Sequence, residues 1–316
     1  MQNKTPVIQT EKLSMVYRNG RKAVYALNNL DLTIQPGEIF GYLGPNGAGK
    51  TTTIRLLLDL IRPTTGHAHI LGMDIQKQAV EIHRHLGFLP GELNLWETLS
   101  GREVIEYINR LRGGHDTKYA LNLAERLEFD MGIRVRNYST GNKRKLGLIL
   151  ALMNKPELLI LDEPTSGLDP LMQQIFLQLM REVRQEGRTV FLSSHVLNEV
   201  QEICDRVGIL RSGELKEVKT VVELTHSDFR WITIQFRNAI QPELLASVPG
   251  VSELSLNGPR ARLKLIGDFD PLIHALTNQY VVDLEVQEPT LEEIFLTYYG
   301  DSPAVQNNHK HEEAKS

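Results

Sequence analysis

The sequence predicts an α/β fold in which an antiparallel β layer, a parallel-sheet core and a helical subdomain are followed by a small α+β domain. Three observations support this prediction. Residues 7–18 and 24–34 alternate apolar and polar side chains, short apolar strands from residue 38 onward are followed by amphipathic helices, and the pattern changes again after residue 220. Alternation with period two indicates half-buried strands, and strands that alternate with helices are typical of parallel βαβ units.

The elements of the first 220 residues follow in order from these patterns. The two alternating segments flank the turn Asn19-Gly20, so they are expected to pair as antiparallel strands. Three strand–helix pairs then build the parallel sheet: EIFGYLG with 51–61, LLILDEP with 171–185, and TVFLSS with 196–204. Residues 92–150 are predicted to be mostly helical and to form a subdomain, because GREVIEYINRLR and YALNLAERLEF space their apolar residues with period 3.6.

The remaining residues predict a second domain and a tail. After the strand pair RVGILRSGELKEV, residues 221–300 are expected to form a small α+β domain. Its strands are WITIQF, SELSL, ARLKLI and VVDLEV, and its helices are QPELLASV, DPLIHALTN and TLEEIFLTYY. Residues 301–316 lack apolar spacing and are predicted to be disordered.

Composition excludes several classes of protein. The net charge of -4 gives no electrostatic argument for a nucleic-acid partner, so none is expected. Cys204 is the single cysteine, which rules out an intrachain disulfide and is interpreted as core packing. The first twelve residues lack the apolar segment of a signal peptide, and no window is apolar enough to span a membrane. The chain is therefore expected in the cytoplasm.

A glycine-rich loop carries the strongest chemical signal. It follows the strand EIFGYL and opens a helix, which is the context that a phosphate-binding GxxxxGK(S/T) loop requires. Its backbone N–H groups are expected to face the phosphates of ATP, Lys50 to reach the β and γ phosphates as a catalytic group, and the Thr51 hydroxyl to bind Mg²⁺. The predicted nucleotide-binding residues of this loop are Gly44, Pro45, Asn46, Gly47, Ala48, Gly49, Lys50, Thr51 and Thr52.

Two acids follow the apolar run Leu158–Leu161, at the end of a predicted buried strand. Ligands of open α/β sheets bind at the carboxyl ends of the strands, so Asp162 is expected to hold Mg²⁺ opposite Thr51. Glu163 would lie near the γ-phosphate, where a carboxylate can polarise an attacking water. Glu163 is therefore the predicted general base of ATP hydrolysis.

The segment YSTGNKRKLGLILALMNKP, just before that strand, resembles the signature motif of the ATP-binding subunits of ABC transporters, usually written LSGGQ. Ser139 and Gly141 match the motif, whereas Tyr138, Thr140 and Asn142 depart from it. Despite these three differences, the segment still has a hydroxyl and backbone N–H groups at the start of a helix, which are the useful features of the motif. The resemblance covers about residues 5–220 and implies a P-loop NTPase fold of the ABC type, with Ser139 and Gly141 contacting ATP.

Three further residues carry expectations that the resemblance implies. The segment 166–169 (SGLD) resembles the D-loop, whose Asp169 is expected at the nucleotide, and His195 in FLSSH resembles the switch histidine that contacts the γ-phosphate and the base. Tyr17 is similar to the aromatic residue that stacks on adenine.

One departure from the family pattern concerns the metal. After the strand LGFLP the family has a glutamine that touches Mg²⁺ or its water, but this chain has Gly91 followed by Glu92. Either Glu92 substitutes as a metal ligand from the next position, or that contact is lost and the loop carries only mechanical coupling.

The resemblance also implies partners. In the family the signature of one subunit closes over ATP held by the phosphate loop of another, so a head-to-tail homodimer is expected, with a heterodimer of related subunits as the alternative. Because no membrane span is predicted, transport would require separate integral membrane permease subunits, expected to contact residues 88–105 from the cytoplasmic face of the membrane. The stretch EPTLEEIFLTYYG resembles the end of bacterial drug- and antibiotic-export ATPases, which favours export.

Two other functions compete with transport. The first is a soluble ABC-type ATPase that acts on ribosomes or DNA, for which Lys143, Arg144 and Lys145 could form a basic patch. Next to a signature motif, a solvated helix start that faces phosphate is the preferred interpretation of this run. The second is an ATP-gated scaffold without turnover, which the presence of both Glu163 and His195 disfavours.

Overall fold

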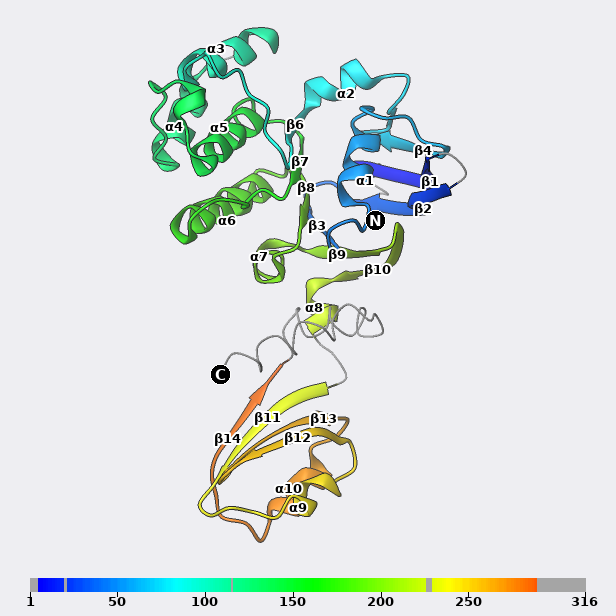
Figure 1. The fold of residues 1–316 in the computed structure, drawn as a ribbon, viewed down its shortest axis with the longest axis vertical. Coiled ribbons are helices and arrows are strands. Elements are labelled where there is room, and N and C mark those ends of the chain that lie inside the picture. Colours follow the sequence, from blue (N-terminus) through cyan, green and yellow to red (C-terminus); the bar gives the residue numbers. More distant parts are fainter. Residues whose placement is uncertain (1–4, 20–21, 115, 226–228, 289–316) are drawn as a thin grey trace. The chain divides into compact units, whose positions relative to one another are not determined.

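The structure is a computed structural model that describes residues 5–19, 22–114, 116–225 and 229–288. The chain divides into two compact units, with the boundary between Thr220 and Val221. Figure 1 shows the order of the elements along the chain, and each unit is described by itself.

The first unit begins with an antiparallel sheet whose strand order is β2-β1-β4-β5. The long strands β1 (Ile8–Asn19) and β2 (Lys22–Ile34) pair along most of their length, as their alternating sequences predict. On its other edge β1 pairs with β4 (Thr65–Ile70), which in turn pairs with the short β5 (Met73–Asp74). The apolar residues on one side of this layer, including Ile8, Leu13 and Leu30, are fully buried.

A six-stranded sheet with the order β10-β9-β3-β8-β7-β6 forms the centre of this unit. Its strands are β3 (Ile39–Leu43), β6 (Leu86–Leu89), β7 (Leu158–Asp162), β8 (Thr189–Ser194), β9 (Arg206–Arg211) and β10 (Glu214–Thr220). All neighbours are parallel except β10, which runs antiparallel to β9. Because β3, β7 and β8 are buried on both faces, they appear in the sequence as continuous apolar runs.

Helices surround these sheets, and Figure 1 shows α3, α4 and α5 grouped apart from the antiparallel layer. Helix α3 begins with a capping box in which Ser100 and Glu103 exchange hydrogen bonds, so its start is fixed by local sequence. The helices of this unit are α1 (Lys50–Leu57), α2 (Ala79–His85), α3 (Gly101–Leu111), α4 (Lys118–Arg126), the 3₁₀ turn η1 (Val135–Asn137), α5 (Thr140–Leu152), α6 (Pro170–Gln185) and α7 (Leu197–Ile203).

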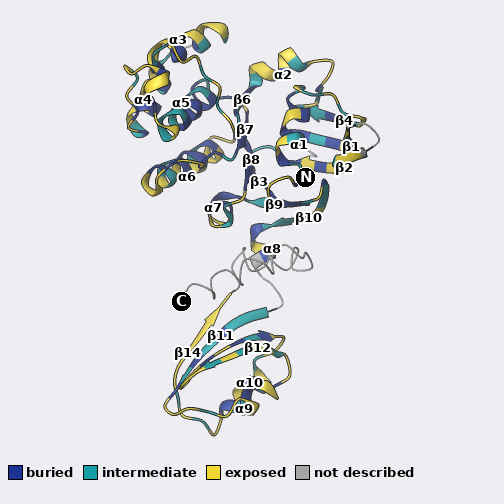
Figure 2. Cartoon of the chain, viewed as in Figure 1, coloured by how far each residue is buried: buried dark blue, intermediate teal, exposed yellow. Residues whose placement is uncertain are grey.

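The core of the first unit lies between the two sheets and around α1. Phe40 and Tyr42 of β3 contact Phe191 of β8, with ring centroids 6.1 and 5.3 Å apart. Figure 2 shows these central strands as buried. Cys204 is also buried, and burial raises the pKa of its thiol, which agrees with a packing role.

The second unit contains α8 (Val221–Thr225) and a four-stranded antiparallel sheet with the order β12-β13-β11-β14. The strands are β11 (Phe229–Phe236), β12 (Val251–Asn257), β13 (Arg260–Ile266) and β14 (Val281–Gln287), and the helices between them are α9 (Glu243–Ala246) and α10 (Asp270–Leu276). The chain order is βαββαβ. Ile232, Ile234 and Leu263 pack with Leu245 and Leu272 into a core of their own.

Several boundaries differ from those that the sequence predicts. The helix expected over 51–61 ends at Leu57, because Asp59 adopts a left-handed conformation with φ 53°. The helix expected over 241–248 is reduced to Glu243–Ala246 between Pro242 and Pro249. The helical subdomain starts at Gly101, and residues 92–99 are irregular. The predicted helix TLEEIFLTYY and the tail 301–316 lie outside the described residues.

The elements β4, β5 and α2 were not predicted, because residues 65–85 show neither a clear period of two nor one of 3.6. In the part of the chain that the structure describes, no helix combines the length and the apolar character needed to cross a membrane.

Separate cores predict separate unfolding. Ile160 in β7 and Ile234 in β11 are fully buried, so Ile160→Ala and Ile234→Ala should each cost about 2–5 kcal/mol. We expect Ile160→Ala to lower the transition temperature of the first unit alone and Ile234→Ala that of the second alone in scanning calorimetry. Ile273→Ala, at a position 57% exposed in the second unit, is the control. A single transition that both core variants shift equally would contradict this prediction.

Candidate functional site

The phosphate loop joins the end of β3 to the start of α1, where Lys50 is the first helical residue. Gly49 has φ 113°, and a Cβ built on it would lie 2.4 Å from the carbonyl oxygen of Ala26 in β2. Only glycine fits there, so the loop backbone rests directly on the antiparallel layer. A cavity of about 200 Å³ opens over the loop, lined by Pro45, Asn46, Gly47, Gly49, Lys50, Thr51 and Thr52 together with Ala26 and Glu163.

The ammonium of Lys50 is buried inside this loop. Its Nζ donates to the carbonyl oxygen of Gly44 over 2.6 Å and lies 3.4 Å from Oε1 of Glu163. Lys50 Nζ also lies 3.4 Å from the carbonyl oxygen of Pro45, and its N–H groups can bind phosphate oxygens in place of these partners.

Asp162 lies at the carboxyl end of β7 and is 3% exposed. One of its carboxylate oxygens accepts a hydrogen bond from the Thr51 hydroxyl over 3.0 Å, and the other accepts one from the hydroxyl of Ser193 in β8. Hydroxyl and carboxylate oxygens side by side fit Mg²⁺, which prefers oxygen ligands and binds few of them from the protein. Ser193 was not predicted. Its only sequence signal is its place at the end of an apolar strand.

Glu163 and His195 form the second polar pair of the site. His195 Nδ1 lies 2.5 Å from Oε2 of Glu163, and the backbone N–H of Glu163 donates to the Ser193 carbonyl over 3.1 Å. Glu163 has φ 50°, an uncommon conformation for a residue with a side chain. This backbone geometry turns the carboxylate away from β7 and toward both Lys50 and His195.

A further acid behind this pair was also not predicted. Glu199 in α7 accepts a hydrogen bond from the Thr165 hydroxyl over 2.7 Å, while its other oxygen is buried and has no hydrogen-bond partner among the described residues. Burial raises the pKa of this carboxyl group. Glu199 therefore links α7, which follows His195, to the loop that follows Glu163.

The signature and D-loop residues lie together but do not line the phosphate-loop cavity. Ser139 is the N-cap of α5 and accepts from the backbone N–H of Asn142 over 3.2 Å. A Cβ on Gly141 would lie 2.9 Å from the carbonyl oxygen of Gly167. Asp169 caps α6 by accepting from the N–H of Met172 over 3.0 Å. Within the described residues of one chain these groups thus form a second polar surface, separate from the cavity.

Tyr17 and Glu92 are likewise outside the cavity lining. Tyr17 is 42% exposed in β1 and pairs with Val24, two residues before the Ala26 that contacts the loop. Glu92 is exposed, and no hydrogen bond or ion pair between described residues joins it to Thr51 or Asp162. By contrast, a Cβ on Gly91 would lie 3.2 Å from Oδ2 of Asp162. Position 91 therefore faces the acid.

Arg144 departs from its predicted environment. The interpretation of residues 143–145 as a solvated helix start is wrong for this residue, because Arg144 is 5% exposed. Its guanidinium donates to the carbonyl oxygens of Pro90 (2.7 Å), Gly91 (2.8 Å) and Ser166 (3.2 Å). Burial lowers the pKa of Arg144, and the nearby charges of Asp162 and Glu163 oppose that effect. Arg144 thereby joins the signature helix to two loops of the site.

The geometry supports phosphoryl chemistry. One edge of the sheet brings together four features of a phosphate site. They are an anion site at a helix start, a buried cation, a hydroxyl–carboxylate pair, and a separate carboxylate with a histidine partner. These groups can bind a triphosphate and orient a water toward it.

Comparison with known proteins identifies the family. The family described as ABC transporter matches residues 27–166. The chain is 29% identical to the linearmycin resistance ATP-binding protein LnrL of Bacillus subtilis (strain 168), over 93% of this chain and 98% of that protein. It is 37% identical to the bacitracin transport ATP-binding protein BcrA of Bacillus licheniformis, over 67% of this chain and 69% of that protein.

A solved structure gives the same answer for the fold. The dimeric structure of MJ0796, a bacterial ABC transporter cassette, superposes with a TM-score of 0.63 and 25% identity, over 68% of this chain and 98% of that one. The predicted α/β fold of the ABC type is thus confirmed, and this chain belongs to the family of ABC transporter ATP-binding proteins as one of its ATPases.

Proposed function

We propose that this ATPase powers export through separate membrane permease subunits, by closing head-to-tail with a second copy over two molecules of Mg-ATP. One observation carries the proposal. The cavity over the phosphate loop is lined by residues of that loop together with Ala26 and Glu163. Ser139 and Gly141, which are also predicted to contact ATP, lie on a different polar surface of the same chain. A second chain that brings its α5 start to the loop would complete the enclosure. A related ATPase subunit could replace the second copy.

The residues of the predicted site receive roles from their contacts and positions. Lys50 would bind the β and γ phosphates, and Thr51 with Asp162 would hold Mg²⁺, which neutralises phosphate charge when bound. Glu163 would act as the general base, with His195 holding its carboxylate and contacting the γ-phosphate. Tyr17 would stack on adenine at the exposed edge of the antiparallel layer.

The metal contact that the family glutamine makes would be absent. Gly91 stands at the position that faces Asp162, while the side chain of Glu92 is exposed. Of the two alternatives for this loop, the geometry favours mechanical coupling over metal binding by Glu92. Arg144 supports that role because it holds the backbone at Pro90 and Gly91.

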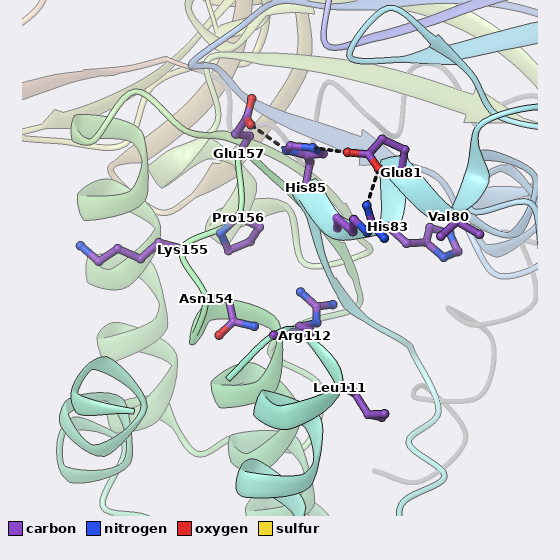
Figure 3. Close-up of a pocket in the computed structure, with 12 residues that line it drawn as sticks. Val80, Glu81, His83, His85, Leu111, Arg112, Asn154, Lys155, Pro156 and Glu157 are labelled. Atoms are coloured by element: carbon purple, nitrogen blue, oxygen red, sulfur yellow. Dashed lines mark hydrogen bonds and ion pairs between the residues drawn. The ribbon is translucent and has the colours of Figure 1, made fainter. Parts of the chain in front are cut away.

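A groove in the first unit suggests where a permease would bind. It measures about 1120 Å³ and lies between α2, the end of α3 and the segment 154–157 that leads into β7. Figure 3 shows Arg112 and Asn154 in its wall and His85 between Glu81 and Glu157. His85 contacts Glu157 at 2.9 Å and Glu81 at 3.2 Å, and these hydrogen bonds raise the pKa of the imidazole.

The chemistry of this groove indicates what its partner must offer. The guanidinium of Arg112 donates a hydrogen bond to the Leu86 carbonyl oxygen. The amide nitrogen of Asn154 is buried and has no hydrogen-bond partner among the described residues. Leu111 adds an apolar side chain that is 66% exposed. A short permease segment with an apolar face and one or two acceptor groups would fit, and it would hold the ATPase at the cytoplasmic face of the membrane. The expected contact segment 88–105 joins the end of β6 to the start of α3 and does not line this groove, so the groove is a second place for the contact.

The direction of transport rests on relatives. LnrL is named for linearmycin resistance and BcrA for bacitracin transport, and both names fit removal of antibiotics from a cell. For this chain export remains a proposal.

Closure over ATP can be tested with the acid beside the loop. In Glu163→Gln the fold and the phosphate contacts remain but the base is lost, so ATP turnover should fall by about a hundredfold or more. With saturating Mg-ATP this variant should be a dimer in light scattering. The control Glu163→Gln/Lys50→Ala should stay monomeric, because it lacks the buried cation for phosphate. A monomeric Glu163→Gln protein under these conditions would falsify head-to-tail closure.

The role of Arg144 predicts a separation of binding from turnover. Arg144→Lys keeps the charge but cannot span three carbonyl oxygens, and an unsatisfied buried carbonyl costs about 1–3 kcal/mol. We expect kcat for ATP to fall about tenfold while nucleotide affinity changes less than about twofold. Lys143→Met is the control, since Lys143 neighbours Arg144 but is only partly buried. Equal losses of affinity in both variants would show a general disturbance of α5 instead.

Permease binding can be tested by a charge in the groove. Leu111→Asp should abolish co-purification with the membrane partner and leave the ATPase rate of the isolated chain unchanged, because Leu111 ends α3 and does not line the phosphate-loop cavity. Leu121→Asp, at another exposed leucine on α4, should retain the partner. Retention of RNA or ribosomes, with no membrane protein in either case, would contradict the transport proposal.

A further inference from the structure

Two contacts join the loop after β7 to the segment after β8. The first is the pair Glu163–His195, in which the carboxylate lines the phosphate-loop cavity and the imidazole is 58% exposed. The second lies further along the same two segments, where the Thr165 hydroxyl donates to Oε2 of Glu199 over 2.7 Å. Thr165 is 4% exposed, so the second contact is shielded from water.

The carboxyl group of Glu199 is only half satisfied. Its Oε2 accepts from Thr165, while its Oε1 is buried and accepts no hydrogen bond from a described residue. Burial raises the pKa of this carboxyl group, and the nearby charge of Glu163 raises it further. A buried acceptor without a partner is unfavourable for folding. The position is therefore better explained by what Glu199 holds than by a contribution to stability.

Thr165 lies inside the turn that leads from Glu163 to the D-loop. The N–H of Ser166 donates to the carbonyl oxygen of Glu163 over 3.2 Å and closes this turn. Two side chains hold it by backbone atoms: Ser193 Oγ accepts from the N–H of Glu163, and Arg144 donates to the carbonyl oxygen of Ser166. Helix α7 holds the turn between these two points, through the Thr165 hydroxyl.

We propose that Glu199 is a positioning residue of the ATPase, which keeps the segment of His195 attached to the loop of Glu163 during hydrolysis. The inference rests on the proposed function, in which Glu163 is the general base and His195 contacts the γ-phosphate. Glu199 itself does not line the phosphate-loop cavity, so it acts through the Thr165 hydroxyl and not on the nucleotide. The two segments thus have one contact at the site and one behind it.

The contact behind the site matters because the contact at the site changes. The base takes a proton from the attacking water, and a neutral carboxyl accepts a weaker hydrogen bond than a carboxylate does. The pair Glu163–His195 therefore weakens at the moment when both side chains must stay in place. The hydrogen bond between Thr165 and Glu199 takes no part in that proton transfer, and its burial protects it from competition by water.

Loss of the buried contact is expected to affect turnover and not binding. The residues proposed to bind phosphate line the cavity, whereas Thr165 and Glu199 do not. A base that is displaced by a fraction of an ångström meets the water in a poorer geometry, which slows the chemical step and leaves the phosphate contacts unchanged. The values of kcat and of nucleotide affinity should therefore respond differently.

Matched pairs of substitutions in the full-length chain test the proposal. Thr165→Val and Glu199→Met keep the approximate shape of each side chain but remove the donor or the acceptor, so each should lower kcat for ATP about tenfold. Affinity for ADP, measured by equilibrium binding, should change less than about twofold. Thr165→Ser and Glu199→Gln retain a donor and an acceptor, so each should keep kcat within about threefold of the natural chain.

The double variant Thr165→Val/Glu199→Met separates positioning from stability. With both partners apolar, no donor or acceptor of this contact is left unsatisfied, so its thermal unfolding temperature should equal or exceed that of either single variant. Its kcat should still be about tenfold below that of the natural chain and no lower than in the single variants, because all three lack the same contact. If kcat recovers together with stability in the double variant, the proposal is overturned.

Glu202→Met is the control on the same helix. Glu202 is exposed and pairs with Arg181 of α6, so the same substitution there should leave kcat unchanged. Unchanged kcat in Thr165→Val or Glu199→Met, or an equal loss in Glu202→Met, would overturn the proposal. Glu163→Gln in the same assay tests the proposed base separately, since retained turnover in that variant refutes the base and leaves the comparison of the matched pairs valid.

Discussion

The site depends on one buried carboxylate. Asp162 accepts hydrogen bonds from Thr51 at the start of α1 and from Ser193 at the end of β8, and it is itself the last residue of β7. These bonds fix the phosphate loop against the sheet edge and offset the cost of burying the charge. Everything else in the site is arranged around this position: Glu163 is the next residue, Gly91 faces the acid from the end of β6, and Arg144 adds a nearby positive charge.

Arg144 extends this arrangement beyond the reacting groups. The guanidinium of Arg144 donates to three backbone carbonyl oxygens and so fixes the peptide planes of the loops that carry them. These hydrogen bonds do not depend on which side chains the loops carry. The loop after β6 and the loop after β7 are therefore linked through backbone atoms to the helix that begins at Ser139. Motion of that helix toward a partner would move both loops as a unit, which is what a coupling element between ATP and a distant groove requires.

Much of the fold could be predicted from the sequence, because its strongest patterns are local. Period-two alternation in β1 and β2, apolar runs in β3, β7 and β8, and the glycine loop all reflect nearest-neighbour geometry. Residues 65–85 carried no such pattern, and helix ends depended on single residues such as Asp59. The contacts of Arg144, Ser193 and Glu199 could not be predicted, because each one joins residues that are far apart in the sequence and come together only in the folded chain.

The 3.4 Å contact between Lys50 and Glu163 has a consequence for the end of a catalytic cycle. The carboxylate of Glu163 lies beside the Lys50 ammonium, at the place where a phosphate is proposed to bind. An arriving nucleotide would therefore replace one anionic partner of Lys50 with another, and the buried ammonium would not be left without a partner. In the proposed cycle Glu163 accepts a proton from water, and once it has lost that proton its carboxylate would compete with the departing phosphate for the ammonium. The residue that assists bond breaking would then also help to release the product.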